Sequence, residues 1–377
     1  MTRSFTFTHA QTLGPDGWHD APIHIHGAQL GDYAEGREID VSGFLLLPGI
    51  IDLHGDAFEK HVAPRRGAMN NLTTGFAGIE AELASCGITT AYLAQFFSWE
   101  GGMRAPSFAH EFLAARTQYR SLGTDLRVQL RFETHMISEY AALSQLIDMF
   151  GIDYVVLNDH LPHAALEAGK KPPRLTGQAL RAGRSPEAHH AMMRALHENG
   201  DRVEEALRSL LARHRDVTFG SHDDASQDGR RAWHALGVHI AEFPETLEAA
   251  EAAKALGDAV VIGAPNAMRG GSHNRNVSAH DLIRAGLIDA LASDYHYPSM
   301  HLAMRRLVND GVCDLAQAWA LISSGPARVI GCDDRGVIAP NYRADMVIMR
   351  QEDMRIMGTM AQGRFTYLAD TLAARLL

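Results

Sequence analysis

The sequence has few cysteines, no long apolar run and no excess of positive charge, and each of these absences excludes a class of protein. Its three cysteines, Cys86, Cys313 and Cys332, are odd in number and widely spaced. They suggest neither a disulfide framework nor a zinc ribbon, and a cytoplasmic location is the simplest expectation. No run of about 18 apolar residues occurs, so no membrane span is expected, and the first eight residues lack the apolar segment of a signal peptide.

The balance of charge is acidic. Lysine and arginine number 35 against 45 aspartate and glutamate residues, a net charge of −10, which argues against a general nucleic-acid binder. An anionic small-molecule substrate stays compatible with this charge, because bound divalent cations can dominate the local field. The 21 histidines make imidazole available, but only their positions can say what they do.

The length and the order of apolar segments favour a (β/α)8 barrel. The 377 residues suit one barrel of about 250 residues with an accessory part. Short apolar runs recur with helical patterns between several of them, such as residues 78–85, 246–256 and 281–285, and Ser185 with Pro186 predicts a helix start. Such alternation implies a parallel sheet, and eight strands imply closure. The eight predicted strands are residues 49–54, 89–93, 127–133, 154–160, 217–222, 239–243, 259–263 and 290–294.

Both ends of the chain resemble short strands instead. Residues 5–7 and 22–27 alternate polar and apolar side chains, with a turn signal at 14–17, and residues 336–340 and 344–349 return to the same composition. We therefore predict that residues 1–47 and 334–377 pair into one small β-domain, of β-sandwich type, and that residues 48–333 form the barrel.

Polar residues of metal-binding type stand at the ends of five predicted strands. In this fold the active site lies at the carboxyl ends of the strands, and one isolated His-x-Asp would be weak evidence. Together the set is large enough for two divalent ions, with a carboxylate such as Glu133 bridging them. The predicted ligands are His54, Asp56, Glu133, His160, His222 and Asp294.

With these residues in place, the chain resembles the amidohydrolase superfamily, and within it the phosphonate-degrading PhnM family of diphosphatases that act on ribose 1-methylphosphonate 5-triphosphate. The resemblance spans nearly the whole chain, and its more specific blocks are Ser-His-Asp-Asp and Ala-Pro-Asn followed by Arg-Gly-Gly-Ser-His. The matching segments are residues 53–61, 131–133, 159–160, 221–225, 242–246, 263–266, 269–273, 276–279 and 291–295.

The resemblance implies a mechanism and a cofactor. The six residues above would hold two divalent ions, zinc by expectation with manganese or iron as alternatives, which lower the pKa of a shared water. Asp294 would accept the proton of that water and return it later. The expected reaction is cleavage of a phosphoanhydride with release of diphosphate.

Other residues are candidates for contact with an anionic substrate. The glycine-rich segment after the seventh strand can bring backbone N–H groups and cationic side chains to an anion, and the segments after the first and eighth strands lie at the same barrel face. The alternatives are a solvated loop after the first strand, an ordinary turn for the glycine-rich segment and a structural role after the eighth strand. The candidates are Lys60, His61, Arg65, Arg269, Ser272, His273 and His296.

Two segments depart from the family pattern and leave the substrate open. After His160 the family usually has Thr-Pro-Gly-Gln, whereas this chain has Leu161-Pro162-His163-Ala164. After Arg65 the family usually has Pro-Gly and soon a Trp, which residues 66–71 lack. Loops set specificity on a fixed barrel, so a carbon–nitrogen hydrolase (deacetylase, deaminase or cyclic amidase) is the second hypothesis and a non-catalytic scaffold the third. A homodimer is the expected oligomeric state.

Overall fold

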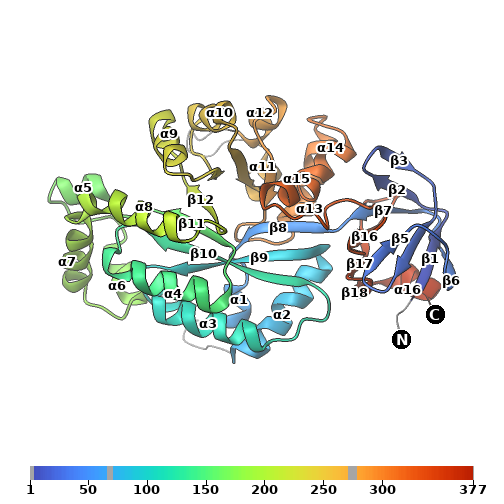
Figure 1. Ribbon diagram of the computed structural model, residues 1–377, viewed down its shortest axis with the longest axis horizontal. Coiled ribbons are helices and arrows are strands. Elements are labelled where there is room, and N and C mark those ends of the chain that lie inside the picture. Colours follow the sequence, from blue (N-terminus) through green and yellow to red (C-terminus); the bar gives the residue numbers. More distant parts are fainter. Residues whose placement is uncertain (1–3, 66–70, 271–277, 377) are drawn as a thin grey trace. The chain divides into compact units, whose positions relative to one another are not determined.

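The computed structural model describes residues 4–65, 71–270 and 278–376 of the chain (Figure 1). All eight predicted strands are present in one sheet of the order β15-β14-β13-β12-β11-β10-β9-β8. Their bounds are β8 (Ile50–Gly55), β9 (Ile88–Phe97), β10 (Asp125–Glu133), β11 (Tyr154–Asn158), β12 (Thr218–His222), β13 (Ile240–Glu242), β14 (Ala259–Gly263) and β15 (Ala290–Ala292).

The first and last strands of this sheet meet and close it. Gly55, the last residue of β8, forms a parallel bridge with Asp294, two residues beyond β15. The backbone N–H of Asp294 donates to the carbonyl of His54 at 2.8 Å, and the N–H of Asp56 donates to the carbonyl of Asp294 at 2.9 Å. The expected (β/α)8 barrel is therefore confirmed.

The terminal segments form two further sheets. One has the order β5-β4-β1-β6 and contains N-terminal strands alone, whereas the other, β18-β17-β16-β7-β2-β3, combines strands from both ends of the chain, as predicted. The limits of the predicted small domain stay a prediction. The strands are β1 (Ser4–Thr8), β2 (Gln11–Gly14), β3 (Gly17–His19), β4 (Ile23–His26), β5 (Gln29–Gly31), β6 (Arg37–Asp40), β7 (Phe44–Pro48), β16 (Met346–Arg350), β17 (Ile356–Ala361) and β18 (Arg364–Leu368).

Alternation explains why these terminal segments form strands. In β4 the two isoleucines are buried and the two histidines are half-buried, which is the period of a strand with one face on a core. Ile25 packs with Phe7, Leu46 and Met346 in a core that joins both ends of the chain. Residues 336–340, by contrast, form no strand, because Gly336 has a φ of 86° and Pro340 has no N–H to donate.

The predicted helices are also present. Ser185 caps α7 by accepting a hydrogen bond from the N–H of Ala188 at 3.1 Å, and Thr246 caps α10 in the same way. The helices are α1 (Glu59–Val62), α2 (Leu72–Ser85), α3 (Pro106–Gln118), α4 (Tyr140–Phe150), α5 (His163–Glu167), α6 (Leu175–Arg181), α7 (Pro186–His197), α8 (Val203–Arg213), α9 (Gln227–Ala235), α10 (Leu247–Leu256), α11 (Ala264–Arg269), α12 (Ala279–Arg284), α13 (Ser299–Asn309), α14 (Leu315–Ala320), α15 (Ser324–Val329) and α16 (Asp370–Leu376). Within the described ranges, none of these helices has the length and apolarity that a membrane crossing requires.

The chain divides into two compact units. Unit 1 comprises Met1–Leu93, Tyr119–Arg127 and Ala259–Leu377, and unit 2 comprises Ala94–Gln118 and Val128–Asp258. Strands β8, β14 and β15 belong to unit 1, whereas β11, β12 and β13 belong to unit 2. The candidate site residues are therefore described unit by unit.

Candidate functional site

Each of the six predicted metal ligands lies at or just beyond the carboxyl end of a barrel strand. In unit 1 these are His54 and Asp56 at β8 and Asp294 after β15, and in unit 2 they are Glu133 at β10, His160 after β11 and His222 at β12. Parallel strands of one sheet have their carboxyl ends at the same edge, which is the edge that carries the active site in barrels of this type.

In unit 1 the predicted ligands are held by the seam between β8 and β15. Asp52 lies beneath them, fully buried, and its carboxylate accepts hydrogen bonds from the N–H of Ser293 at 2.9 Å and from its hydroxyl at 2.6 Å. The N–H of His54 also donates to Asp52, at 3.3 Å. Burial raises the pKa of Asp52, although these hydrogen bonds oppose the rise. The carboxylate thus ties both strand ends of the seam together.

The residue between His54 and Asp56 has to be glycine. A Cβ on Gly55 would lie 2.6 Å from the carboxylate of Asp52, 2.6 Å from the ring of Tyr297 and 2.9 Å from the hydroxyl of Ser293. No side chain fits in that space, because real Cβ contacts are not this short. The His-Gly-Asp sequence is therefore a packing requirement of the seam.

In unit 2, Glu133 and His160 form one half of the predicted ligand set. The buried carboxylate of Glu133 lies 2.5 Å from Nδ1 of His160, and it accepts hydrogen bonds from the N–H of His160 at 3.1 Å and from the indole N–H of Trp99 at 3.3 Å. Burial alone would lower the pKa of His160, but the hydrogen bond to Glu133 and its charge outweigh burial and raise it.

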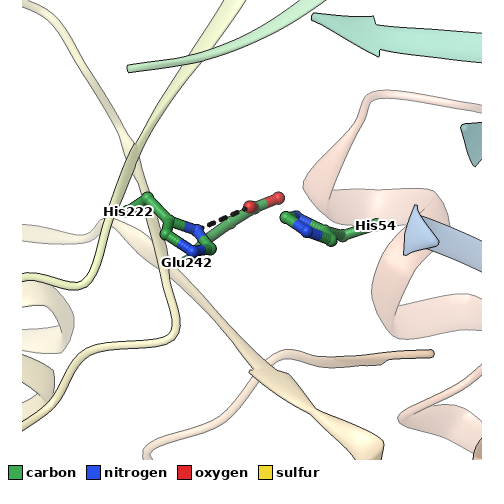
Figure 2. Close-up of side chains that lie close together, drawn as sticks. All are labelled: His54, His222 and Glu242. Atoms are coloured by element: carbon green, nitrogen blue, oxygen red, sulfur yellow. Dashed lines mark ion pairs between the residues drawn. The ribbon is translucent and has the colours of Figure 1, made fainter. Parts of the chain in front are cut away.

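His222 forms the other half, and Figure 2 shows its ion pair with Glu242 of β13, in which Nδ1 lies 3.5 Å from the carboxylate. His54, drawn in the same view, belongs to unit 1. The buried Glu242 also accepts hydrogen bonds from Gln129 at 2.7 Å and from the hydroxyl of Tyr154 at 2.6 Å. These neighbours orient the carboxylate toward the imidazole.

The donor set of unit 2 fits a divalent metal ion. His160, His222 and Asp223 present one ligand atom each within 4.8 Å of one another, and the two imidazole rings have centroids 6.0 Å apart. A combination of imidazole nitrogen and carboxylate oxygen suits zinc, manganese or iron. Two of the three residues were predicted as ligands from the sequence, and Asp223 was not.

Sequence reasoning also missed two buried charged residues of this region. Glu242 ends its strand in the same way as the six predicted ligands, so the strand-end rule alone could have found it. Arg131 points from β10 toward the site: its guanidinium lies 3.0 Å from Nε2 of His222 and 4.0 Å from the ring centre of Phe96. Arg104 lies over the same ring at 4.0 Å. Two guanidinium groups thus contact the ring of Phe96.

The predicted substrate-binding residues are found in several settings. Lys60 and His61 of α1 lie 2.5 Å from the two carboxylate oxygens of Glu82 on α2, and these hydrogen bonds lower the pKa of Glu82 although burial opposes them. Arg65 is exposed. Arg269 ends α11 and donates to the hydroxyl of Tyr295.

Three further predicted contacts complete this set. His296, next to Tyr295, is half-buried, whereas Ser272 and His273 lie outside the described residues. The positions of these residues do not test whether they contact a substrate. All seven assignments therefore stay predictions.

Comparison with known proteins places this geometry in a family. The model of the amidohydrolase family matches residues 178–366. The chain is 31% identical over 347 residues to the alpha-D-ribose 1-methylphosphonate 5-triphosphate diphosphatase of Escherichia coli (strain K12), a match that covers 89% of this chain and 92% of that protein.

Solved structures share the fold at lower identity. The crystal structure of an amidohydrolase aligns with a TM-score of 0.66 and 17% identity, covering 98% of this chain and 100% of that one. The N-acetylglucosamine-6-phosphate deacetylase of Pasteurella multocida aligns with a TM-score of 0.64 and 13% identity, covering 96% and 99% of the two chains. At such identities the likeness concerns the fold alone.

Proposed function

Because the chain belongs to the amidohydrolase family and is a hydrolase, we propose that it cleaves a phosphoanhydride of a ribose 5-triphosphate carrying a phosphonate at C1, and releases diphosphate. The observation that carries this proposal is the 31% identity with the diphosphatase, which extends over 92% of that relative. A match of this extent includes every strand of the barrel, and therefore every strand end from which ligands come.

We propose the six strand-end residues as the ligands of two divalent ions, as the sequence suggests: His54, Asp56, Glu133, His160, His222 and Asp294. When bound, such ions activate water near neutral pH and polarise the phosphoryl group under attack. The chain's own residues supply the proton transfer and the binding. Asp294 accepts the proton of the attacking water at its carboxylate and delivers a proton to the leaving diphosphate.

Binding of an anionic substrate is supported by the guanidinium groups of unit 2. Arg131 is 5% exposed and donates toward His222 at 3.0 Å, and Arg104 contacts the same ring of Phe96. Charge-assisted hydrogen bonds from guanidinium to phosphate are stronger than neutral ones, and they are stronger still where water is excluded. We assign Arg131 to hold a phosphoryl oxygen of the substrate.

The test is a side-by-side assay of two substrate classes. The purified chain, loaded with zinc or manganese, is incubated with ribose 1-methylphosphonate 5-triphosphate and, separately, with a panel of N-acetylated sugars, cyclic amides and aminopurines. We expect ³¹P NMR to show diphosphate released from the triphosphate and no turnover of the amides. Running the reaction in H₂¹⁸O locates the phosphorus that is attacked.

The carbon–nitrogen hydrolase is the second candidate, because the segment Leu161–Ala164 departs from the pattern of the diphosphatase family next to His160. Turnover of an amide without any release of diphosphate would replace the proposed substrate class by this one. Turnover of neither class by a fully metal-loaded, folded chain would refute both.

A further inference from the structure

Three histidines and one aspartate gather in unit 2 outside the six-residue set. His135 lies two residues beyond β10, and Asp159 follows β11 directly. His163 is the first residue of α5, and His197 is the last residue of α7. Four separate segments of the unit therefore bring metal-binding side chains to one place.

The distances within this cluster match those around a shared cation. The carboxylate of Asp159 lies 2.8 Å from Nε2 of His163 and 3.5 Å from Nδ1 of His135, and one ligand atom from each of the three lies within 4.8 Å of the others. Nitrogen and oxygen atoms bound to one tetrahedral zinc ion are about 3.3 Å apart.

His197 contacts the ring nitrogen of His163 that does not face Asp159. Its Nδ1 lies 2.7 Å from Nδ1 of His163, so that Nε2 of His163 is left to face Asp159. When Nε2 binds an ion, Nδ1 keeps its proton and donates it to His197. A hydrogen bond of this kind to the far nitrogen of a ligating histidine fixes its tautomer and its orientation.

The imidazole rings of the cluster lie close to one another. Those of His135 and His163 have centroids 4.8 Å apart, and those of His163 and His197 are 5.0 Å apart. A divalent ion is bound by neutral imidazole, so a group of neighbouring imidazoles beside one carboxylate suits such an ion.

His163 stands directly after the short segment that follows β11 and is the first residue of α5. From this position its imidazole contacts both Asp159 and His197. His163 therefore links the other members of the cluster.

We propose that His135, Asp159 and His163 bind a divalent cation, zinc by their donor set, and that His197 orients His163. Two nitrogens and one oxygen leave a fourth position for water. The side chain of Asp159 is 36% exposed and that of His163 32%, so the ion reaches the site from solvent. Bound there, it joins the residue next to His160 to α5 and to the segment after β10.

The test is the metal content of the full chain. Wild type, His163→Gln and a control are stripped with chelator, reloaded with excess Zn²⁺, freed of unbound metal by gel filtration and measured by plasma mass spectrometry. His163→Gln is expected to hold one zinc equivalent fewer per chain. The control is His110→Gln, an exposed histidine of α3, and it is expected to hold the wild-type number. Equal zinc content in His163→Gln and wild type overturns the proposal.

A second series of variants, made in a His222→Ala chain, distinguishes the proposed cluster from the six proposed ligands at the strand ends. In a His222→Ala chain the proposed cluster is intact, so adding His163→Gln is again expected to remove one equivalent. If His163→Gln removes zinc only when His222 is present, the metal belongs to the strand-end residues and the proposal is wrong. His197→Gln is expected to weaken zinc at the cluster by about 10- to 100-fold, and unchanged affinity would exclude its positioning role. Far-UV circular dichroism verifies folding, and His135→Gln replaces His163→Gln if that variant does not fold.

Discussion

At the scale of single residues, several residues that directly follow barrel strands have a strained backbone conformation. Asp223 after β12, Phe243 after β13 and Asp294 after β15 have φ angles of 59°, 55° and 56°. Residues other than glycine rarely adopt this region, and a β-carbon there costs about 1–3 kcal/mol. Such strain persists where neighbouring contacts enforce it, which for Asp294 are the two backbone hydrogen bonds to β8.

Replacement of Asp294 by asparagine tests its chemical role without disturbing this conformation. Asparagine tolerates a positive φ nearly as well as aspartate does, so Asp294→Asn should fold normally while kcat falls by about 10²- to 10⁴-fold, the usual contribution of a general base. Steady-state kinetics with the preferred substrate measures this. The control is Asp370→Asn, an exposed aspartate with a φ of 44°. A kcat within threefold of wild type would remove Asp294 from the proton transfer.

His301 makes the stability of the chain dependent on pH. It lies on α13, its Nε2–H donates to the carbonyl of Met354 at 2.8 Å, and burial lowers its pKa to about 4. The unfolded chain, with a histidine pKa near 6.5, takes up the proton first. The contribution of His301 to stability is therefore complete above pH 6.5 and is lost as the pH falls toward 4.

His301→Gln should reduce this acid sensitivity, because glutamine can donate to the same carbonyl but does not titrate. Between pH 7.5 and pH 5 the wild type should lose about 2 kcal/mol more stability than the variant, seen as a larger fall in Tm by scanning calorimetry. His110→Gln serves as the exposed control. Identical falls in Tm for wild type and His301→Gln would contradict the assignment.

At the scale of elements, the seam between β8 and β15 decides where unit 1 holds its predicted ligands. One buried carboxylate, Asp52, receives both hydrogen-bond donors of Ser293 and the N–H of His54. Asp52 and Ser293 are 241 residues apart in the chain. The two strands that close the barrel are thus joined directly beneath His54 and Asp294.

Ser293→Ala should weaken that seam. It removes one donor from a buried carboxylate, and an unsatisfied buried group costs about 1–3 kcal/mol. We expect a lower Tm by scanning calorimetry and, because Asp294 is the next residue, a lower kcat with little change in KM. Ser209→Ala, on the exposed face of α8, should stay within about 0.5 kcal/mol of wild type. If both variants behave alike, the seam does not position Asp294.

At the scale of the whole molecule, the six proposed ligands are spread along the chain, from His54 in β8 to Asp294 after β15. An ion that binds the folded chain and not the unfolded chain stabilises the fold by mass action. Stability and activity should therefore both depend on the metal.

Removal of metal tests this dependence. Dialysis against a chelator should abolish turnover and lower the Tm, because metal at 100 times its Kd contributes about 2.7 kcal/mol. Stepwise return of Zn²⁺ should restore both, and activity followed against added equivalents counts the ions that turnover needs. The Asp294→Asn variant should regain Tm without regaining activity. A Tm indifferent to chelator and to added zinc would argue against structural coupling of the metal.

The sequence by itself determined the barrel and the carboxyl ends of β10, β12 and β14, whereas β9 extends beyond its predicted end and β11 and β15 stop before theirs. A barrel strand can be recognised from local sequence, as an apolar run that stops at a polar residue. His54, Glu133 and His222 could therefore be placed at strand ends from the neighbouring residues alone. The same rule applied to β13 would have included Glu242. The pairing of both termini into sheets followed from alternation in the same way.

Only the tertiary structure decided which of these residues have partners. Asp52 meets Ser293 across 241 residues, Lys60 and His61 share Glu82 on the next helix, and Asp159 collects imidazoles from several segments. Hydrogen bonds and ion pairs of this kind depend on distances between side chains that are remote in sequence, and local periodicity carries no information about those distances. The pattern of residues therefore identified the edge of the barrel at which the candidate site residues lie. The tertiary fold determined which side chains contact one another at that edge.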